Sequence, residues 1–277
     1  MIRRRRATWG GALALLLLVA GASALLYMPA WWPTPEPSPS PPANVGPATA
    51  APARPVAPAT GGPASPTTTH RSLSVLERVP TSQKAVALTI DLGETCTPAA
   101  FEAILASLEK RNLHATWFLT GWFLRTYPDL ARRLAAGGHE LGNHTDTHPH
   151  CPRISSERLR AELTNVEELL RRLGLALTSP RYFRPPFGEY DRQVTATAGE
   201  LGYRTVMWTA TSLDYDPHTD PDQARARILR GVEPGAIILM HATDVSRRML
   251  PDLLDTLQER GYQVLPLGEM VRRAETE

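Results

Sequence analysis

The sequence is poor in cysteine and in aromatic residues, and it carries little net charge. Its 277 residues include two cysteines, 6% aromatic residues, 30 basic residues and 28 acidic ones. Two cysteines are too few for a disulfide-rich scaffold, so the fold must depend on a buried core, which a chain of this length can form. Residues 1–70 hold five arginines and one glutamate, so 25 basic and 27 acidic residues remain. This near-neutral remainder argues against nucleic acid as the main partner.

The first 32 residues are typical of a membrane anchor or a signal peptide. Four arginines at positions 3–6 precede an uncharged, mostly apolar run over 9–28, long enough for a helix to span a bilayer core. The arginines place the N-terminus in the cytoplasm. We expect an uncleaved anchor, because the apolar run continues past the small residues 22–24; cleavage there is the alternative. Either outcome predicts that the rest of the chain lies outside the cytoplasm, membrane-anchored or secreted.

Residues 33–70 are rich in proline, alanine and threonine, with 12 prolines among 38 residues. Such a segment cannot bury enough apolar surface to offset the entropy lost on ordering, so we expect a disordered linker. The folded domain is therefore expected at 71–277.

Within that domain, β-rich runs alternate with amphipathic segments. We expect strands at 86–90, 115–119, around 140, near 182, 205–208, 236–240 and near 264, and helices at 98–110, 128–136, 156–173, 221–229, 251–260 and from 268. Strands at this spacing with helical crossovers form parallel βαβ units. About seven of them favour a closed or nearly closed (β/α) barrel over an open sheet.

Polar residues follow the predicted strands, where parallel α/β folds collect functional groups. Asp91 ends the first strand and His241 the sixth, while His144 and His148 follow the third. Four residues apart in a helical turn, two imidazoles lie on one side, as a divalent metal needs. Taken singly, each of these features has a structural alternative. Asp91 could be a turn residue, the loop after the third strand could simply be solvated, and His241 could be a core histidine.

Two further segments follow the fourth and fifth strands. Residues 184–188 read Arg-Pro-Pro-Phe-Gly, and the prolines restrict the backbone that carries Arg184 and Phe187. Trp208 and Asp214 come next, although a core tryptophan and a helix-capping aspartate would look the same.

Together these segments resemble the polysaccharide deacetylases of carbohydrate esterase family 4, the NodB-homology domain. That family's pattern is T-F-D-D-G, H-[ST]-x-x-H, R-P-P-[YF]-G, D-x-x-D-W and a last strand ending in L-x-H. Residues 144–148 and 184–188 match in full, and Leu239 and His241 fit the last strand. The resemblance covers nearly all of 84–272, and it implies a distorted (β/α) barrel of about seven strands.

The resemblance also implies a catalytic set. Asp91 would be the general base, oriented and kept ionised by Arg184. His241 would be the general acid, held by Asp214.

A divalent metal, expected to be zinc, would bind His144 and His148. However, Leu92 stands where the family has a ligand aspartate. Two histidines and one carboxylate suit catalytic zinc, so we expect Glu94 or Asp91 to complete the set. A metal-free protein that only binds glycan is the alternative.

The substrate would meet four further residues. The resemblance assigns an oxyanion-binding N–H to Phe187, an apolar wall for the acetyl methyl to Leu239, and a sugar-stacking face to Trp208. Tyr215 stands where tryptophan is usual, and Thr211 replaces the first aspartate of the same motif.

Cys96 and Cys151 follow Asp91 and His148 closely, in loops expected to rise from one rim. We predict a disulfide between them, with two buried free thiols as the alternative.

The sequence therefore predicts an extracytoplasmic, metal-dependent N-deacetylase acting on peptidoglycan or an N-acetylglucosamine polymer. The alternatives are a glycan-binding pseudoenzyme and an O-acetyl esterase on the same fold. Polysaccharide and membrane are the partners expected, without nucleic acid or a protein partner.

Overall fold

The computed structural model describes residues 75–277. The predicted anchor and linker lie outside the described residues, so both remain predictions. No helix between residue 75 and the C-terminus is both long and apolar enough to cross a membrane.

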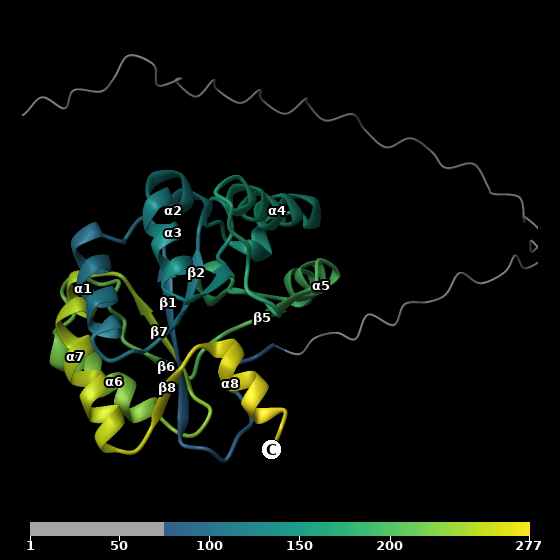
Figure 1. Ribbon diagram of the computed structural model, residues 1–277. Coiled ribbons are helices and arrows are strands. Elements are labelled where there is room, and N and C mark those ends of the chain that lie inside the picture. The colour runs from purple at the N-terminus through teal and green to yellow at the C-terminus, as the bar shows by residue number, and fades with distance from the viewer. Residues whose placement is uncertain (1–74) are drawn as a thin grey trace, which may run out of the picture. The chain divides into compact units, whose positions relative to one another are not determined.

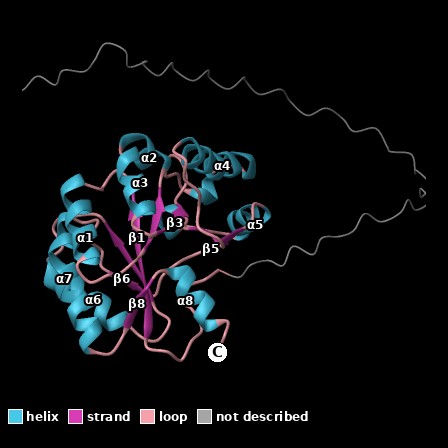
Figure 2. Cartoon of the chain, in the orientation of Figure 1, coloured by secondary structure: helices cyan, strands magenta, loops and turns pink. Residues whose placement is uncertain are grey.

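One sheet of eight strands forms the centre of the described domain (Figure 2). The strands are β1 (Ala85–Leu92), β2 (Thr116–Leu119), β3 (Glu140–Asn143), β4 (Arg181–Phe183), β5 (Tyr203–Thr205), β6 (Ala210–Thr211), β7 (Ile237–His241) and β8 (Gln263–Leu265). Every pair between named strands is parallel. Seven strands run in the order β5-β4-β3-β2-β1-β7-β6, and β8 pairs with β1. The predicted barrel is therefore a half-barrel, open between β5 and β6.

Helices connect successive strands, as the sequence predicts, except that β5 leads directly to β6 (Figure 1). They are α1 (Pro98–Glu109), α2 (Gly121–Thr126), α3 (Pro128–Ala136), α4 (Ser156–Arg172), α5 (Arg192–Glu200), α6 (Pro221–Gly231), α7 (Asp244–Glu259) and α8 (Leu267–Ala274), with 3₁₀ turns η1 (Cys151–Arg153) and η2 (Pro186–Gly188). Side-chain oxygens cap several of them, including Ser155 at the start of α4 and Thr243 at the start of α7.

Strand β1 divides its side chains between the interior of the half-barrel and the outer helices. Val86, Leu88, Ile90 and Leu92 belong to the larger hydrophobic cluster, with residues of α1 and α7. Ala85 and Ala87 belong instead to an inner cluster with Phe118, Tyr182 and Ile237. Because successive side chains of a strand alternate between its faces, Thr89 and Asp91 continue the inner row and Leu92 the outer one.

A short segment before β1 lies across the opening of the half-barrel. Leu76 forms a parallel bridge with Val206, just after β5, and Arg78 forms an antiparallel bridge with Ala236, just before β7. Leu76 and Val79 are both buried in the inner cluster. Residues 76–79, here called the strap, therefore link the two sides of the opening.

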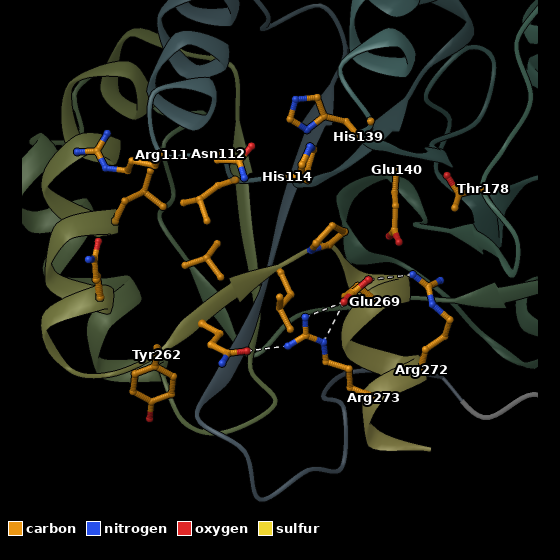
Figure 3. Close-up of a pocket in the computed structure, with 18 residues that line it drawn as sticks. Arg111, Asn112, His114, His139, Glu140, Thr178, Tyr262, Glu269, Arg272 and Arg273 are labelled. Atoms are coloured by element: carbon orange, nitrogen blue, oxygen red, sulfur yellow. Dashed lines mark hydrogen bonds and ion pairs between the residues drawn. The ribbon is translucent and has the colours of Figure 1, made fainter. Parts of the chain in front are cut away.

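The amino ends of the strands surround a cavity of about 780 Å³, shown in Figure 3. Its charged groups pair with one another or with neighbouring polar groups. Glu269 pairs with Arg272 and Arg273 of α8, while buried Glu140 accepts hydrogen bonds from Thr116 Oγ1 and the Gly268 N–H, both at 2.8 Å. This end of the interior therefore anchors α8.

The predicted disulfide is wrong: Cys96 and Cys151 are both free and buried. Cys96 packs in the large outer cluster, whereas Cys151 packs with Leu159, Phe183 and Tyr203. The two thiols thus belong to different packing clusters, although their loops follow the neighbouring strands β1 and β3, each paired with β2. Burial raises the pKa of each thiol to about 12, which keeps both in the unreactive protonated form.

Candidate active site

The carboxyl ends of β1 and β7 place two polar side chains next to each other. In the register of these strands, Ala87 pairs with Ile237, Thr89 with Leu239, and Asp91 with His241. All of these positions alternate toward the interior. The interior row thus ends in an acidic and a basic side chain, on the rim where the sequence predicted the site.

Asp91 is held by a buried guanidinium. Its Oδ1 accepts a hydrogen bond of 2.8 Å from Nη1 of Arg184, and its Oδ2 lies 3.6 Å from Nε2 of His144. Burial alone would raise the pKa of Asp91, but Arg184, His144 and His241 outweigh it and hold the pKa below its ordinary value. Asp91 is therefore ionised near neutral pH, as a general base must be.

Arg184 is fully buried, and its surroundings fix its orientation. Its guanidinium carbon lies 4.2 Å from the centroid of the Phe118 ring, and its Nη2 donates to the Met207 carbonyl at 3.2 Å. A cation over an aromatic face is favourable, the more so when it is desolvated. The guanidinium is thus fixed in position beneath Asp91, as the sequence analysis predicted.

His241 and Asp214 form the second predicted pair. Nδ1 of His241 is 2.8 Å from Oδ1 of Asp214, and the His241 N–H donates to Oδ2 at 2.7 Å. The hydroxyl of Ser246 also donates to Oδ2. Burial lowers the pKa of His241, but the Asp214 carboxylate outweighs this, so the pKa lies above its ordinary value. A histidine that keeps its proton suits a general acid.

His144 and His148 lie side by side, with ring centroids 4.9 Å apart. Nδ1 of His144 is 2.8 Å from the Arg184 carbonyl oxygen, which can only accept, so Nδ1 carries the proton and Nε2 is left with a free lone pair. Burial lowers the pKa of His144, and it lowers the pKa of His148 to about 4. Both imidazoles are therefore neutral, the form that binds a metal.

A third metal ligand is harder to find. Leu92 is fully buried in the outer cluster and Glu94 is exposed. Within residues 75–277, no group of three or more His, Cys, Asp or Glu side chains is placed to hold a metal. The donor chemistry thus fits a divalent ion at two positions, His144 and His148. The predicted completion by Glu94 is not assembled, and Asp91 is the carboxylate beside the histidines.

Aromatic side chains flank the rim on both sides. Phe187 is 56% exposed, and its ring centroid is 4.6 Å from that of His148. Tyr215 is 54% exposed and its ring centroid lies 5.8 Å from that of His241. Phe187 and Tyr215 are thus placed to meet a substrate that lies across the site.

The other two predicted substrate residues are less open. Leu239 is buried one layer below His241, and half-buried Trp208 lies near Arg184, with 5.7 Å between ring centroid and guanidinium carbon. Trp208 was predicted within a strand, but β5 ends at Thr205.

Sequence analysis missed two buried polar residues that support the rim, Ser246 and Glu162. Ser246 lies under Asp214, and Glu162 of α4 binds the turn between His144 and His148. Each occupies the apolar face of its helix, next to Val245 in α7 or Leu163 in α4. A polar residue within an apolar helical stripe was the signal available in the sequence.

Sequence and structure comparisons agree with this geometry. The model of a family described as polysaccharide deacetylase matches residues 78–206. A chitooligosaccharide deacetylase of Bradyrhizobium sp. is 30% identical, over 68% of this chain and 90% of its own length. A peptidoglycan-N-acetylglucosamine deacetylase of Bacillus cereus is 31% identical, over 69% of this chain and 70% of its own.

A solved structure of similar fold is a carbohydrate esterase family 4 pseudoenzyme from Bacillus anthracis. It superposes with a TM-score of 0.67 at 29% identity, covering 72% of this chain and 69% of that one. The match to the family model and the relatives, together with the paired acid and base on β1 and β7, leads to one conclusion. The chain belongs to the polysaccharide deacetylase family, hydrolases that act on carbon–nitrogen bonds other than peptide bonds.

Proposed function

We propose that this chain is an extracytoplasmic, metal-dependent deacetylase that removes N-acetyl groups from a cell-envelope glycan. One observation carries the chemistry: an ionised carboxylate and a protonated imidazole occupy paired positions on adjacent strands, Asp91 on β1 and His241 on β7. Amide hydrolysis needs both a base for the attacking water and an acid for the leaving amine.

The residues divide the reaction between them. Asp91 removes a proton from water as its oxygen adds to the acetyl carbonyl carbon. His241 then gives its proton to the amine nitrogen as the carbon–nitrogen bond breaks, so that acetate and a free amino sugar are released. Arg184 keeps Asp91 ionised, Asp214 keeps His241 protonated, and the Phe187 N–H is proposed to bind the oxyanion.

His144 and His148 would hold the divalent ion, and the ion would supply Lewis-acid polarisation of the acetyl carbonyl and of water. Their neutral state and the free lone pair of His144 Nε2 support this assignment. Because Leu92 contributes no oxygen and Asp91 acts as the base, water would fill the remaining positions, and we expect weaker binding than at a three-ligand site.

The substrate and the location are inferred from the relatives and the sequence. Named relatives act on chitooligosaccharide and on peptidoglycan, and both present N-acetylated sugars. The exposed rings of Phe187 and Tyr215 suit sugar faces. The arginine-led apolar run at 9–28 would bring the domain to such a polymer outside the cytoplasm.

Leu92 also supports a second candidate, a glycan-binding pseudoenzyme, because it removes the expected ligand from the site. The two candidates are separated by acetate release from chitooligosaccharide and from peptidoglycan, measured with the full chain and with added zinc. Release that a chelator abolishes supports the metal-dependent deacetylase. Glycan binding without acetate release supports the pseudoenzyme, and release from O-acetylated glycan alone identifies an esterase.

A further inference from the structure

The turn between the two histidines has a strained backbone. Thr145 has a φ of 68° and His148 a φ of 56°, both in the left-handed region. A β-branched residue such as threonine is rare there, because its side chain crowds the backbone. Conformations of this kind persist only where the surrounding structure over-determines them. The environment of residues 145–148 must therefore hold the turn in place.

Glu162 of α4 binds this turn through its backbone. Its Oε2 accepts hydrogen bonds from the N–H groups of Asp146 at 2.9 Å and Thr147 at 2.7 Å, and its Oε1 accepts the Thr147 hydroxyl at 2.8 Å. Arg158, one helical turn away, lies 2.6 Å from Oε1 and balances the charge. The Glu162 side chain is only 1% exposed. Hydrogen bonds to an ionised acceptor are the stronger kind, and here several of them end on one carboxylate.

Helix α2 holds the same turn from another side. The N–H groups of Gly121 and Trp122 donate to the carbonyl oxygens of Thr145 and Asp146, at 3.0 and 3.2 Å. Thus α2 binds the Thr145 and Asp146 carbonyl groups, and Glu162 binds the Asp146 and Thr147 N–H groups. The Thr145 N–H donates instead to Oδ1 of Asn143, and the His148 N–H to the Thr145 hydroxyl. Removing Glu162 would free one side of a strained segment, and the Thr145 and His148 conformations would lose part of their support.

We propose that Glu162 is a positioning residue, which fixes the His148 imidazole by binding the backbone of residues 146 and 147. It does not touch the reacting atoms. His148 lies directly after this clamp, with its ring 4.9 Å from that of His144 and 4.6 Å from that of Phe187. A displacement of about 1 Å at such a site lowers a rate by about 10²-fold. The catalytic part of this inference rests on the proposed function, whereas the clamp itself does not.

The test uses Glu162→Ala and Glu162→Gln in the full chain, with Glu168→Ala as the matched control. Glu168 lies on the same helix, but within residues 75–277 it pairs only with Arg171 and Arg172. Glutamine keeps one oxygen that can still accept both backbone N–H groups. Amide hydrogen exchange of the peptide over 144–151 reports the clamp without any substrate, and acetate release gives kcat and KM.

We expect Glu162→Ala to speed exchange in this peptide by about tenfold or more while exchange elsewhere in the domain is unchanged. We also expect it to lower kcat by about 10-fold to 10²-fold with KM within about threefold. Glu162→Gln should restore most of the slow exchange over 144–151 and most of kcat. Glu168→Ala should match the wild type in both measurements. Unchanged exchange in Glu162→Ala overturns the inference, as does an increase spread evenly over the domain. If the wild type releases no acetate, the proposed function fails, and the exchange result alone decides the clamp.

Discussion

Two carboxylates point into the half-barrel, one at each end, and their environments differ. At the carboxyl ends of the strands, Asp91 faces a charged partner, Arg184, and has two imidazoles nearby. At the amino ends, the donors that Glu140 binds in the described domain are both neutral, the Thr116 hydroxyl and the Gly268 N–H. One sheet thus carries one acid surrounded by ionisable groups and another that acts as a structural hydrogen-bond acceptor.

The difference shows why cavity size is a poor guide to function in this fold. The cavity of about 780 Å³ lies at the amino end, where the charges satisfy one another. The carboxyl end instead concentrates opposed protonation states and left-handed residues, among them Thr145, His148 and Phe187. Strain and perturbed protonation are features of functional sites. The comparison predicts that changes at the carboxyl end affect chemistry and changes at the amino end affect stability.

The largest effect is expected for Asp91→Asn. An amide keeps the shape but cannot take a proton from water, so kcat should fall by about 10²-fold or more. Acetate release by the purified full chain measures this, and circular dichroism checks the fold. Asp129→Asn, on an exposed aspartate of α3, is the control and should change nothing. Activity within a few fold of wild type would show that Asp91 is not the base.

A second change, Leu92→Asp, adds the ligand that the family pattern expects. Leu92 is fully buried among apolar side chains, so an unpaired carboxylate there should destabilise the metal-free protein by about 2–4 kcal/mol. If the new carboxylate turns to the histidines, zinc should raise the melting temperature of the variant and should bind about tenfold or more tightly than to wild type. Thermal melts with and without zinc measure the shift in melting temperature, and calorimetric titration measures the affinity for zinc.

Leu92→Asn is the matched control, because asparagine is polar and similar in size to aspartate but carries no charge. A zinc response equal in Leu92→Asp and Leu92→Asn would mean that position 92 does not reach the metal.

Glu140→Ala tests the amino end. It leaves the buried N–H of Gly268 without its acceptor, so the free energy of unfolding should fall by about 1–3 kcal/mol. Denaturant titration measures this loss, while kcat should stay within about threefold of wild type. Glu269→Ala, on a half-exposed pairing partner of α8, should have a much smaller effect. A fall in kcat as large as that of Asp91→Asn would show that the amino end also contributes to catalysis, contrary to this comparison.

The smallest expected effect is a shift in a pH profile. His241 must be protonated to act as the acid, so activity falls as pH rises through its pKa, which Asp214 holds above the ordinary value of about 6.5. Asp214→Asn removes the carboxylate charge and lowers that pKa. The alkaline limb of kcat against pH should therefore move to lower pH. Asp216→Asn, an exposed neighbour, is the control, and an unmoved limb in Asp214→Asn would contradict the assignment.

Much of the site was predictable because strand ends mark it in sequence. The positions of Asp91, Arg184, Asp214 and His241 follow from motifs placed after β-rich runs, and the structure brings all of them to one rim. The expected helix from Pro251 begins instead at Asp244, because Thr243 caps it and Pro251 is accommodated inside. Proline near a helix start is common, and this favoured the later boundary.

The features that could not be predicted from the sequence depend on packing between distant segments. Cys96 and Cys151 are close to catalytic residues in sequence, yet each packs in its own cluster. Glu162 contacts its turn from 16 residues away. The distant partner of a side chain and the cluster in which it packs are not contained in a local pattern, and the two-residue strand β6 is too short to give a pattern at all.

The segment that follows the strap contacts the residues that follow α8. The Ser82 N–H and the Thr81 hydroxyl donate to the side chain of Glu277, so the segment between the strap and β1 is tied to the residues that follow α8. Because residues 76–79 also bridge Val206 and Ala236, the residues after α8 brace the segment that spans the opening of the half-barrel.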